Sequence, residues 1–200
     1  TIERHGLLAC YSAPQALFAD NGELNPELPA LLAEAQTLNA LWLKLSLGHF
    51  LHNQQLDELR EILRDSGMAL VVENASGDFN KTIELLLNKP DEFSVLSGED
   101  NLFYSSLLLG GDGGVTASAH LKTRDFIKVY DYIQNNDSKA ALEIWKEISP
   151  MIPLLFKEPN PTPIKYMLKK IGLINSDEVR LPLVPISQEL RNELDSNIVL

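Results

Sequence analysis

Residues 41–73, LWLKLSLGHFLHNQQLDELREILRDSGMALVVE, contain a strand–helix–strand pattern that indicates the fold class. Two short apolar runs, at 41–47 and 69–73, flank residues 54–66, in which leucines recur at helical spacing. Two strands joined by a helix form the βα unit of α/β proteins, and such strands lie parallel in one sheet. The sequence therefore predicts an α/β fold with a parallel sheet.

The same alternation continues on both sides of this stretch and stops near His120. The sequence predicts five strands, at 6–11, 41–47, 69–73, 93–97 and 114–117. The helices predicted between them lie at 29–39, 54–66, 80–88 and 102–109. After His120 only helices are predicted, at 123–134, 138–156 and 162–171, with a last one that begins at 187.

Five strands are too few for the usual closed (βα)8 barrel, which has eight strands and about 250 residues. The strands could form an open sheet, as in doubly wound α/β domains, or two chains could pair their exposed edge strands. We therefore expect a partial barrel-like sheet and a homo-oligomer, formed through the exposed sheet edges or the C-terminal helices.

The composition is typical of a globular protein and argues against two classes of partner. The 200 residues are 44% hydrophobic and 22% charged, and the formal net charge is −11. An acidic chain repels phosphates, so we expect no nucleic-acid partner. No apolar run approaches the roughly 20 residues that span a bilayer, and the first residues do not resemble a signal peptide, so we expect a cytoplasmic protein without a membrane partner. The single cysteine, Cys10, has apolar neighbours and is predicted to be buried.

Four motifs follow one another in the second half of the chain. They are SVLSGED at 94–100, LGGDGGVTAS at 109–118, EPNPTPIK at 158–165 and RLPLVPIS at 180–187. In this order they resemble the C-terminal half of the dihydrodipicolinate synthase / N-acetylneuraminate lyase family, over about residues 75–196. The resemblance implies the last two strands of a (βα)8 barrel, followed by a C-terminal helical extension.

Members of that family form a Schiff base between pyruvate and a lysine on the sixth strand, in a motif that resembles G-I-K-E-A-[ST]-G-[DN]. The corresponding residues here, 71–78, are VVENASGD, and Glu73 stands in the place of the lysine. A carboxylate cannot form an imine, so this substitution removes the expected nucleophile. The family's threonine pair and catalytic tyrosine also have no recognisable counterpart. The resemblance leaves Gly98, Gly113 and Val115 as the expected remainder of the substrate pocket.

The first 74 residues are similar instead to middle strands of xylose-isomerase-like sugar isomerase/epimerase barrels. In such barrels a glutamate in a V-E-N motif often binds a divalent metal, and Glu73 also occupies that place. One carboxylate is a poor metal site, so we expect no metal and no cofactor. The two resemblances suggest a chimera in one structural domain, with isomerase-like residues 1–74, lyase-like residues 75–122 and a helical extension at 123–200.

Strand alternation places two charged residues near each other. On strand 41–47, Trp42, Lys44 and Ser46 share one face, and the leucines share the other, which should contact helices. Glu73 can lie on the same face of the next strand, as a neighbour of Lys44. One interpretation is an ion pair inherited from a barrel interior. The other is a desolvated lysine that attacks a carbonyl group.

Two further groups of residues have alternative interpretations. His49, His52 and His120 follow strands, on the side where βα sheets bind ligands, and could bind a metal. Because no third ligand is placed beside a histidine pair, surface histidines are favoured. The glycine-rich run at 110–114 could hold a phosphate through backbone N–H groups, but it precedes a strand and lacks the P-loop lysine, so a tight turn is favoured.

Three functions are compatible with these observations. The missing lysine and the mixed resemblance favour a non-catalytic chimera, engineered or recombined from barrel fragments. The first alternative is a pyruvate-dependent aldolase or lyase that uses Lys44, the only lysine in a predicted strand. The second alternative is a metal-dependent sugar isomerase/epimerase that uses Glu73.

Overall fold

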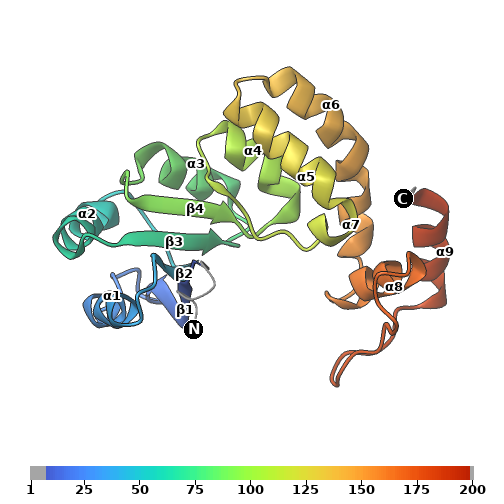
Figure 1. The fold of residues 1–200 in the computed structure, drawn as a ribbon, viewed down its shortest axis with the longest axis horizontal. Helices are drawn as coiled ribbons and strands as arrows, with labels where there is room; N and C mark the ends of the chain where they lie inside the picture. Colours follow the sequence, from blue (N-terminus) through green and yellow to red (C-terminus); the bar gives the residue numbers. More distant parts are fainter. Residues whose placement is uncertain (1–7, 199–200) are drawn as a thin grey trace. The chain divides into compact units, whose positions relative to one another are not determined.

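The computed structural model describes residues 8–198, which form two compact units divided between Val115 and Thr116 (Figure 1). The first unit contains the parallel sheet, and the second consists of helices. The predicted grouping of the whole chain into one structural domain stays a prediction. No helix in the described part of the chain is long and apolar enough to cross a membrane.

The sheet of the first unit has five parallel strands in the order of the sequence. The strands are β1 (Cys10–Phe18), β2 (Trp42–Gly48), β3 (Ala69–Asn74), β4 (Phe93–Ser97) and β5 (Gly113–Gly114). The helices between them are α1 (Leu28–Thr37), α2 (Gln55–Ser66), α3 (Phe79–Asn88), the short 3-10 helix η2 (Asp100–Leu102) and α4 (Phe103–Leu108). In a (βα) barrel each strand lies beside the next strand of the sequence, as here, whereas in a doubly wound sheet the strand order reverses once. The predicted α/β fold with a five-stranded parallel sheet is confirmed.

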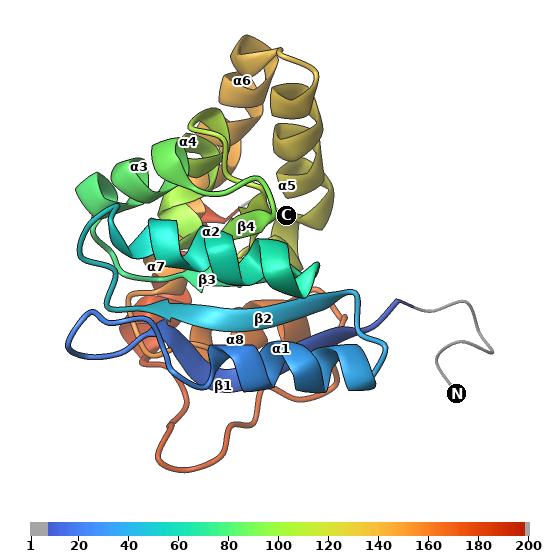
Figure 2. The ribbon, with the colours of Figure 1, turned by 90° about the vertical axis from the view of Figure 1, so that its left-hand side faces the viewer.

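The core of the first unit lies between one face of the sheet and the helices. Leu43, Leu45 and Leu47 of β2 are at most 3% exposed, whereas the residues between them are at least partly exposed. Helices α1 and α2 lie next to each other over the strands (Figure 2). Burying a leucine side chain contributes about 1.5–3 kcal/mol, so this face accounts for much of the stability of the sheet. The predicted separation of the two strand faces is therefore confirmed.

The first strand differs most from its prediction. The predicted strand at 6–11 lies partly outside the described residues, and β1 begins at Cys10 and ends at Phe18. Its register with β2 shifts between Ser12 and Ala16, on either side of Pro14. Proline has no N–H group to donate, and it is tolerated here because β1 pairs with only one described strand and is irregular at this point. Cys10 is exposed and not buried as predicted, because it begins this edge strand.

The second unit is built around a pair of long helices. Its helices are α5 (Ala119–Gln134), α6 (Ser138–Ile148), the 3-10 helix η3 (Ser149–Met151), α7 (Ile152–Leu155), α8 (Thr162–Lys170) and α9 (Gln188–Asn197). Helices α5 and α6 pack together, and the rings of Phe126 and Trp145 meet edge to face with 6.0 Å between their centroids. The helix predicted at 138–156 is divided at η3, because Pro150 cannot continue the hydrogen bonds of an α-helix.

Candidate active site

The face of the sheet opposite the helices carries one row of residues in register. Ala16, Ser46, Glu73, Leu96 and Gly113 are paired from β1 to β5. Neighbouring strands lie about 4.8 Å apart, and residues paired in a sheet point to the same face. None of these five residues is buried. The row is therefore an accessible surface on which substrate could be held.

Lys44 and Glu73 form an ion pair on this face. The Lys44 Nζ atom lies 2.5 Å from Glu73 Oε2, and each side chain is 26% exposed. Lys44 is in register with Val71, so its side chain extends along the strand direction to reach Glu73, two residues further on β3. An ionised donor and acceptor make a shorter and stronger hydrogen bond than neutral groups. The proximity predicted from strand alternation is confirmed.

Gly98 makes room for the Glu73 side chain. It follows β4, and its N–H group donates a hydrogen bond of 2.8 Å to the carbonyl oxygen of Asn74. A Cβ atom on Gly98 would lie 2.8 Å from the Cβ atom of Ala75 and 3.1 Å from the Cγ atom of Glu73. A side chain at this position would overlap Ala75 and crowd Glu73, so the glycine leaves room for the Glu73 side chain.

Gly113 and Val115 lie further along the same sheet. Gly113 pairs with Leu96, which pairs with Glu73, so two strand spacings, or about 10 Å, separate Gly113 from Glu73. Val115 is 46% exposed, and its N–H group donates a 2.8 Å hydrogen bond to the carbonyl oxygen of Ser97. The structure thus brings Gly98, but not these two residues, to the ion pair. The predicted role of all three in a substrate pocket stays a prediction.

A cleft of about 340 Å³ opens at the carboxyl ends of β2 and β3. His49 lines it from the end of β2, and Ser76, Asp78 and Lys81 line it from the loop after β3 and the start of α3. Asp78 caps α3, since its Oδ1 atom accepts a 3.1 Å hydrogen bond from the backbone N–H of Lys81. The sequence analysis missed the last three residues, although an aspartate just before a helical pattern is a capping signal.

The histidines are not arranged as a metal site. His49 Nε2 lies 3.4 Å from Asp20 Oδ1, and both side chains are largely exposed. His52 is exposed, and a ring nitrogen of His120, in the second unit, lies 3.0 Å from the carbonyl oxygen of Ala117. Among residues 8–198, no three His, Cys, Asp or Glu side chains are grouped so that they could hold a metal ion.

The glycine-rich run at 110–114 forms the connection from α4 to β5. Asp112 Oδ2 accepts a 2.8 Å hydrogen bond from the backbone N–H of Val95 and lies 3.1 Å from Lys89 Nζ. This carboxylate stabilises the connection against the edge of β4 and adds negative charge to it. The geometry agrees with the predicted turn and disfavours a phosphate cradle.

A parallel sheet whose strands follow the order of the sequence, with helices on one face, is the architecture of a fragment of a (βα)-barrel protein. The chain belongs to the dihydrodipicolinate synthetase family, whose model matches residues 51–199.

Two relatives illustrate the extent of this match. The chain is 53% identical over 148 residues to "4-hydroxy-tetrahydrodipicolinate synthase 2" of Clostridium acetobutylicum. This match covers 74% of this chain and 50% of that protein. It is 34% identical over 147 residues to the 4-hydroxy-tetrahydrodipicolinate synthase of Chloroherpeton thalassium, covering 74% of this chain and 48% of that protein. The chain thus spans about half the length of the curated relatives that it matches.

Solved structures show the same fold over nearly the whole described chain. The 4-hydroxy-tetrahydrodipicolinate synthase of Methylacidiphilum fumariolicum SolV matches 97% of this chain and 64% of its own, with a TM-score of 0.77 and 23% identity. The chloride-inhibited dihydrodipicolinate synthase of Acinetobacter baumannii, solved with pyruvate, matches 97% of this chain and 75% of its own, with a TM-score of 0.67 and 20% identity.

These findings correct three predictions. The family match begins at residue 51, so residues 51–74 belong to it and not to an isomerase-like part. No comparison supports a xylose-isomerase-like segment or a chimera. The predicted function of a non-catalytic chimera is wrong, because it is contradicted by the 53% identity to a 4-hydroxy-tetrahydrodipicolinate synthase and by the family match. One substitution, Glu73 in the place of a lysine, does not outweigh a similarity that extends over 148 residues.

Proposed function

We propose that this chain is an enzyme of the dihydrodipicolinate synthase type, a lyase that joins pyruvate to an aldehyde. The observation that supports this most is the 53% identity to a 4-hydroxy-tetrahydrodipicolinate synthase over 148 residues. The family match at 51–199 includes β3 and β4. The pyruvate complex of a relative with the same fold supports pyruvate as one substrate. The predicted alternative of a pyruvate-dependent lyase thus replaces the non-catalytic interpretation.

In this proposal Lys44 is the nucleophile. It is the only lysine in the described strands, and its ammonium group lies against the Glu73 carboxylate. Glu73 occupies the motif position at which the family resemblance implies the imine-forming lysine. In this proposal the Lys44 amine, on β2, takes the place of a lysine amine at position 73 on the neighbouring strand β3. Both side chains are 26% exposed, so a small substrate has access to them.

The chemistry that this pair can perform begins with a proton transfer. Glu73 takes a proton from the Lys44 ammonium, and the neutral amine attacks the carbonyl carbon of pyruvate. Loss of water from the addition product gives an imine. Glu73, after releasing its proton to the departing water, removes a proton from the adjacent methyl carbon and leaves an enamine. The enamine carbon attacks the aldehyde to form the new C–C bond, and Glu73 returns its proton to the alkoxide that results. Water then hydrolyses the protonated imine and releases Lys44.

Pyruvate consumption in the presence of a small aldehyde tests this proposal. The wild-type chain should consume pyruvate, and Lys44→Met should abolish turnover, because a thioether cannot form an imine. Lys89→Met is the matched control, because Lys89 is also a partly buried lysine, whose Nζ atom lies 3.1 Å from an Asp112 oxygen, away from the proposed site. Absence of turnover in the wild type, or full activity in Lys44→Met, would contradict the proposal.

We also propose that the chain forms homo-oligomers. Among the described strands, β1 and β5 each pair with one neighbour only. The carbonyl oxygens of Ala16 and Leu17 accept hydrogen bonds from Asn25, so the first half of the nine-residue strand β1 is the part that could pair with another copy. Light scattering after gel filtration should give a mass above that of one chain. A clean monomer at high protein concentration would contradict this.

A further inference from the structure

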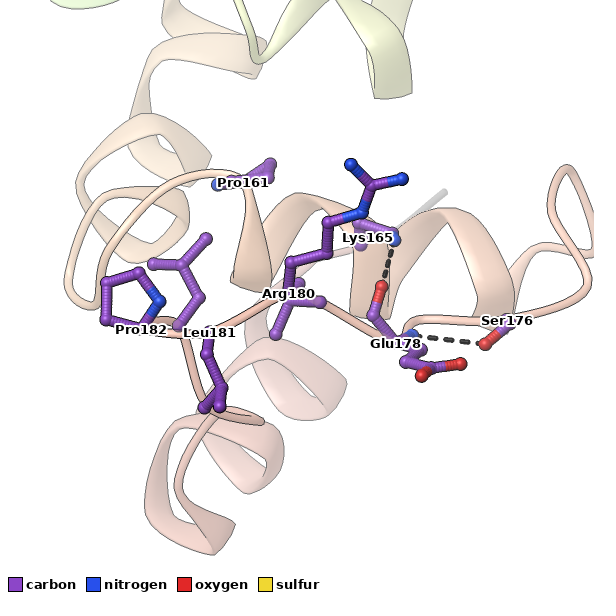
Figure 3. Close-up of a pocket in the computed structure, with 9 residues that line it drawn as sticks. Pro161, Lys165, Ser176, Glu178, Arg180, Leu181 and Pro182 are labelled. Atoms are coloured by element: carbon purple, nitrogen blue, oxygen red, sulfur yellow. Dashed lines mark hydrogen bonds between the residues drawn. The ribbon is translucent and has the colours of Figure 1, made fainter.

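The second unit contains a cavity of about 700 Å³ beside α8 (Figure 3). One wall is formed by Pro161 and Lys165, and the segment that precedes α9 supplies Glu178, Arg180, Pro182 and Leu183. This volume is within the range of small-molecule sites, and the wall combines apolar side chains with a few charged ones, as such sites do. The cavity lies wholly in the second unit and takes no part in the function proposed above.

Two cationic groups converge on this cavity. The Arg180 side chain extends toward the ammonium end of Lys165, and the Glu178 carboxylate points away from both toward Ser176 (Figure 3). Lys165 donates a hydrogen bond to the backbone carbonyl oxygen of Glu178, which fixes its ammonium group at the cavity wall. Both positive charges therefore line the same cavity, and the Glu178 carboxylate forms no ion pair with either of them.

In the described part of this unit, five other lysines pair with carboxylates, whereas Arg124 and Lys139, like Lys165 and Arg180, do not. Lys169 lies 2.7 Å from Asp177, and Lys170 lies 2.7 Å from Asp195. Within residues 8–198, no carboxylate forms an ion pair with Lys165 or Arg180, although the chain has 28 acidic residues and only 17 Lys and Arg. Two positive charges that line one cavity without a carboxylate partner favour the binding of an anion there.

We propose that this cavity binds a small oxyanion, the carboxylate or phosphate group of a compact organic molecule. The planar guanidinium of Arg180 can donate two parallel hydrogen bonds to such a group, and Lys165 adds a point charge. Pro161, Pro182 and Leu183 provide an apolar wall for the rest of the molecule. With two cations in a chain of net charge −11, the site fits one anionic group and not a nucleic acid.

Calorimetric titration with two probes, inorganic phosphate and 3-methylbutanoate, tests the proposal and distinguishes the two anion classes. Sodium chloride at equal ionic strength controls for screening. Arg180→Gln and Lys165→Gln should each weaken binding about tenfold or more, because each removes a charge-assisted hydrogen bond. The matched controls Arg124→Gln and Lys139→Gln change the same charges at exposed positions and should leave the affinity unchanged. Binding of either probe with this pattern supports the proposal and identifies the anion class.

Chemical modification of arginine tests the same site in the wild-type chain, so the result does not depend on whether a variant folds. Phosphate or 3-methylbutanoate should slow the modification of Arg180 by phenylglyoxal, read by peptide mass spectrometry, and should leave Arg124 unaffected. Binding of neither probe, equal protection of both arginines, or equal affinity in the Arg180→Gln and Arg124→Gln variants would overturn the proposal.

Discussion

The Lys44–Glu73 ion pair should couple the stability of β2 to that of β3. Exposed ion pairs contribute about 0.2–1 kcal/mol, and breaking a fully buried pair costs about 3–5 kcal/mol. With both side chains 26% exposed and 2.5 Å between the charged atoms, this pair lies between the two cases. We expect a coupling free energy of about 1–2 kcal/mol between the two side chains.

A double-mutant cycle measures this coupling. Urea unfolding would be followed for the wild type, Lys44→Met, Glu73→Gln and the double variant, and the coupling is the difference between the double change and the sum of the single changes. Each single variant should unfold at a lower urea concentration, and the double variant should lose less than the sum of the two losses. A coupling below about 0.5 kcal/mol lies within ordinary additivity and would refute the ion pair as a structural link between the strands.

Three further predictions concern single residues. Gly98→Val should destabilise the first unit by about 1–3 kcal/mol in urea unfolding, because the new side chain would overlap Ala75 and crowd Glu73. Asp78→Ala should cost about 1 kcal/mol of unfolding free energy in the same assay, because α3 loses its cap. The hydrogen bond from Lys170 holds the pKa of Asp195 below its ordinary value, so the contribution of this pair to stability is present at neutral pH and is lost as the pH falls through that lowered pKa. Lys170→Met should therefore raise the pKa of Asp195 in a carboxyl-carbon NMR titration.

Much of the first unit could be predicted from local pattern. The alternation of leucines with Lys44 and Ser46 in β2 identified the strand, its buried face and the ion-pair partner, because a strand in such a sheet has a period of two. The strand at 93–97 was predicted with its exact bounds. The alternation of apolar and polar residues does not show whether a strand lies at the edge of a sheet. The exposure of Cys10 and the extension of β1 through Pro14 were therefore not predicted.

The proposed sites were predicted less completely. A short motif suggested that the chemistry is lost at Glu73, but the placement of Lys44 against the same carboxylate depends on the register of two strands, which the motif does not contain. The cavity of the second unit could not be predicted either. Lys165 lies in α8, and Arg180 lies in the irregular segment between α8 and α9. The periodicity of apolar residues predicts helices and strands, but it does not predict which helix an irregular segment packs against.

Trapping of the imine tests the central proposal most directly. The protein would be incubated with pyruvate and borohydride, which reduces an imine to a stable amine, and the intact mass and the modified peptide would be determined. We predict one pyruvate adduct, located on Lys44 and absent in Lys44→Met. An unmodified protein, or an adduct located on another lysine, would contradict the assignment of Lys44 as the nucleophile.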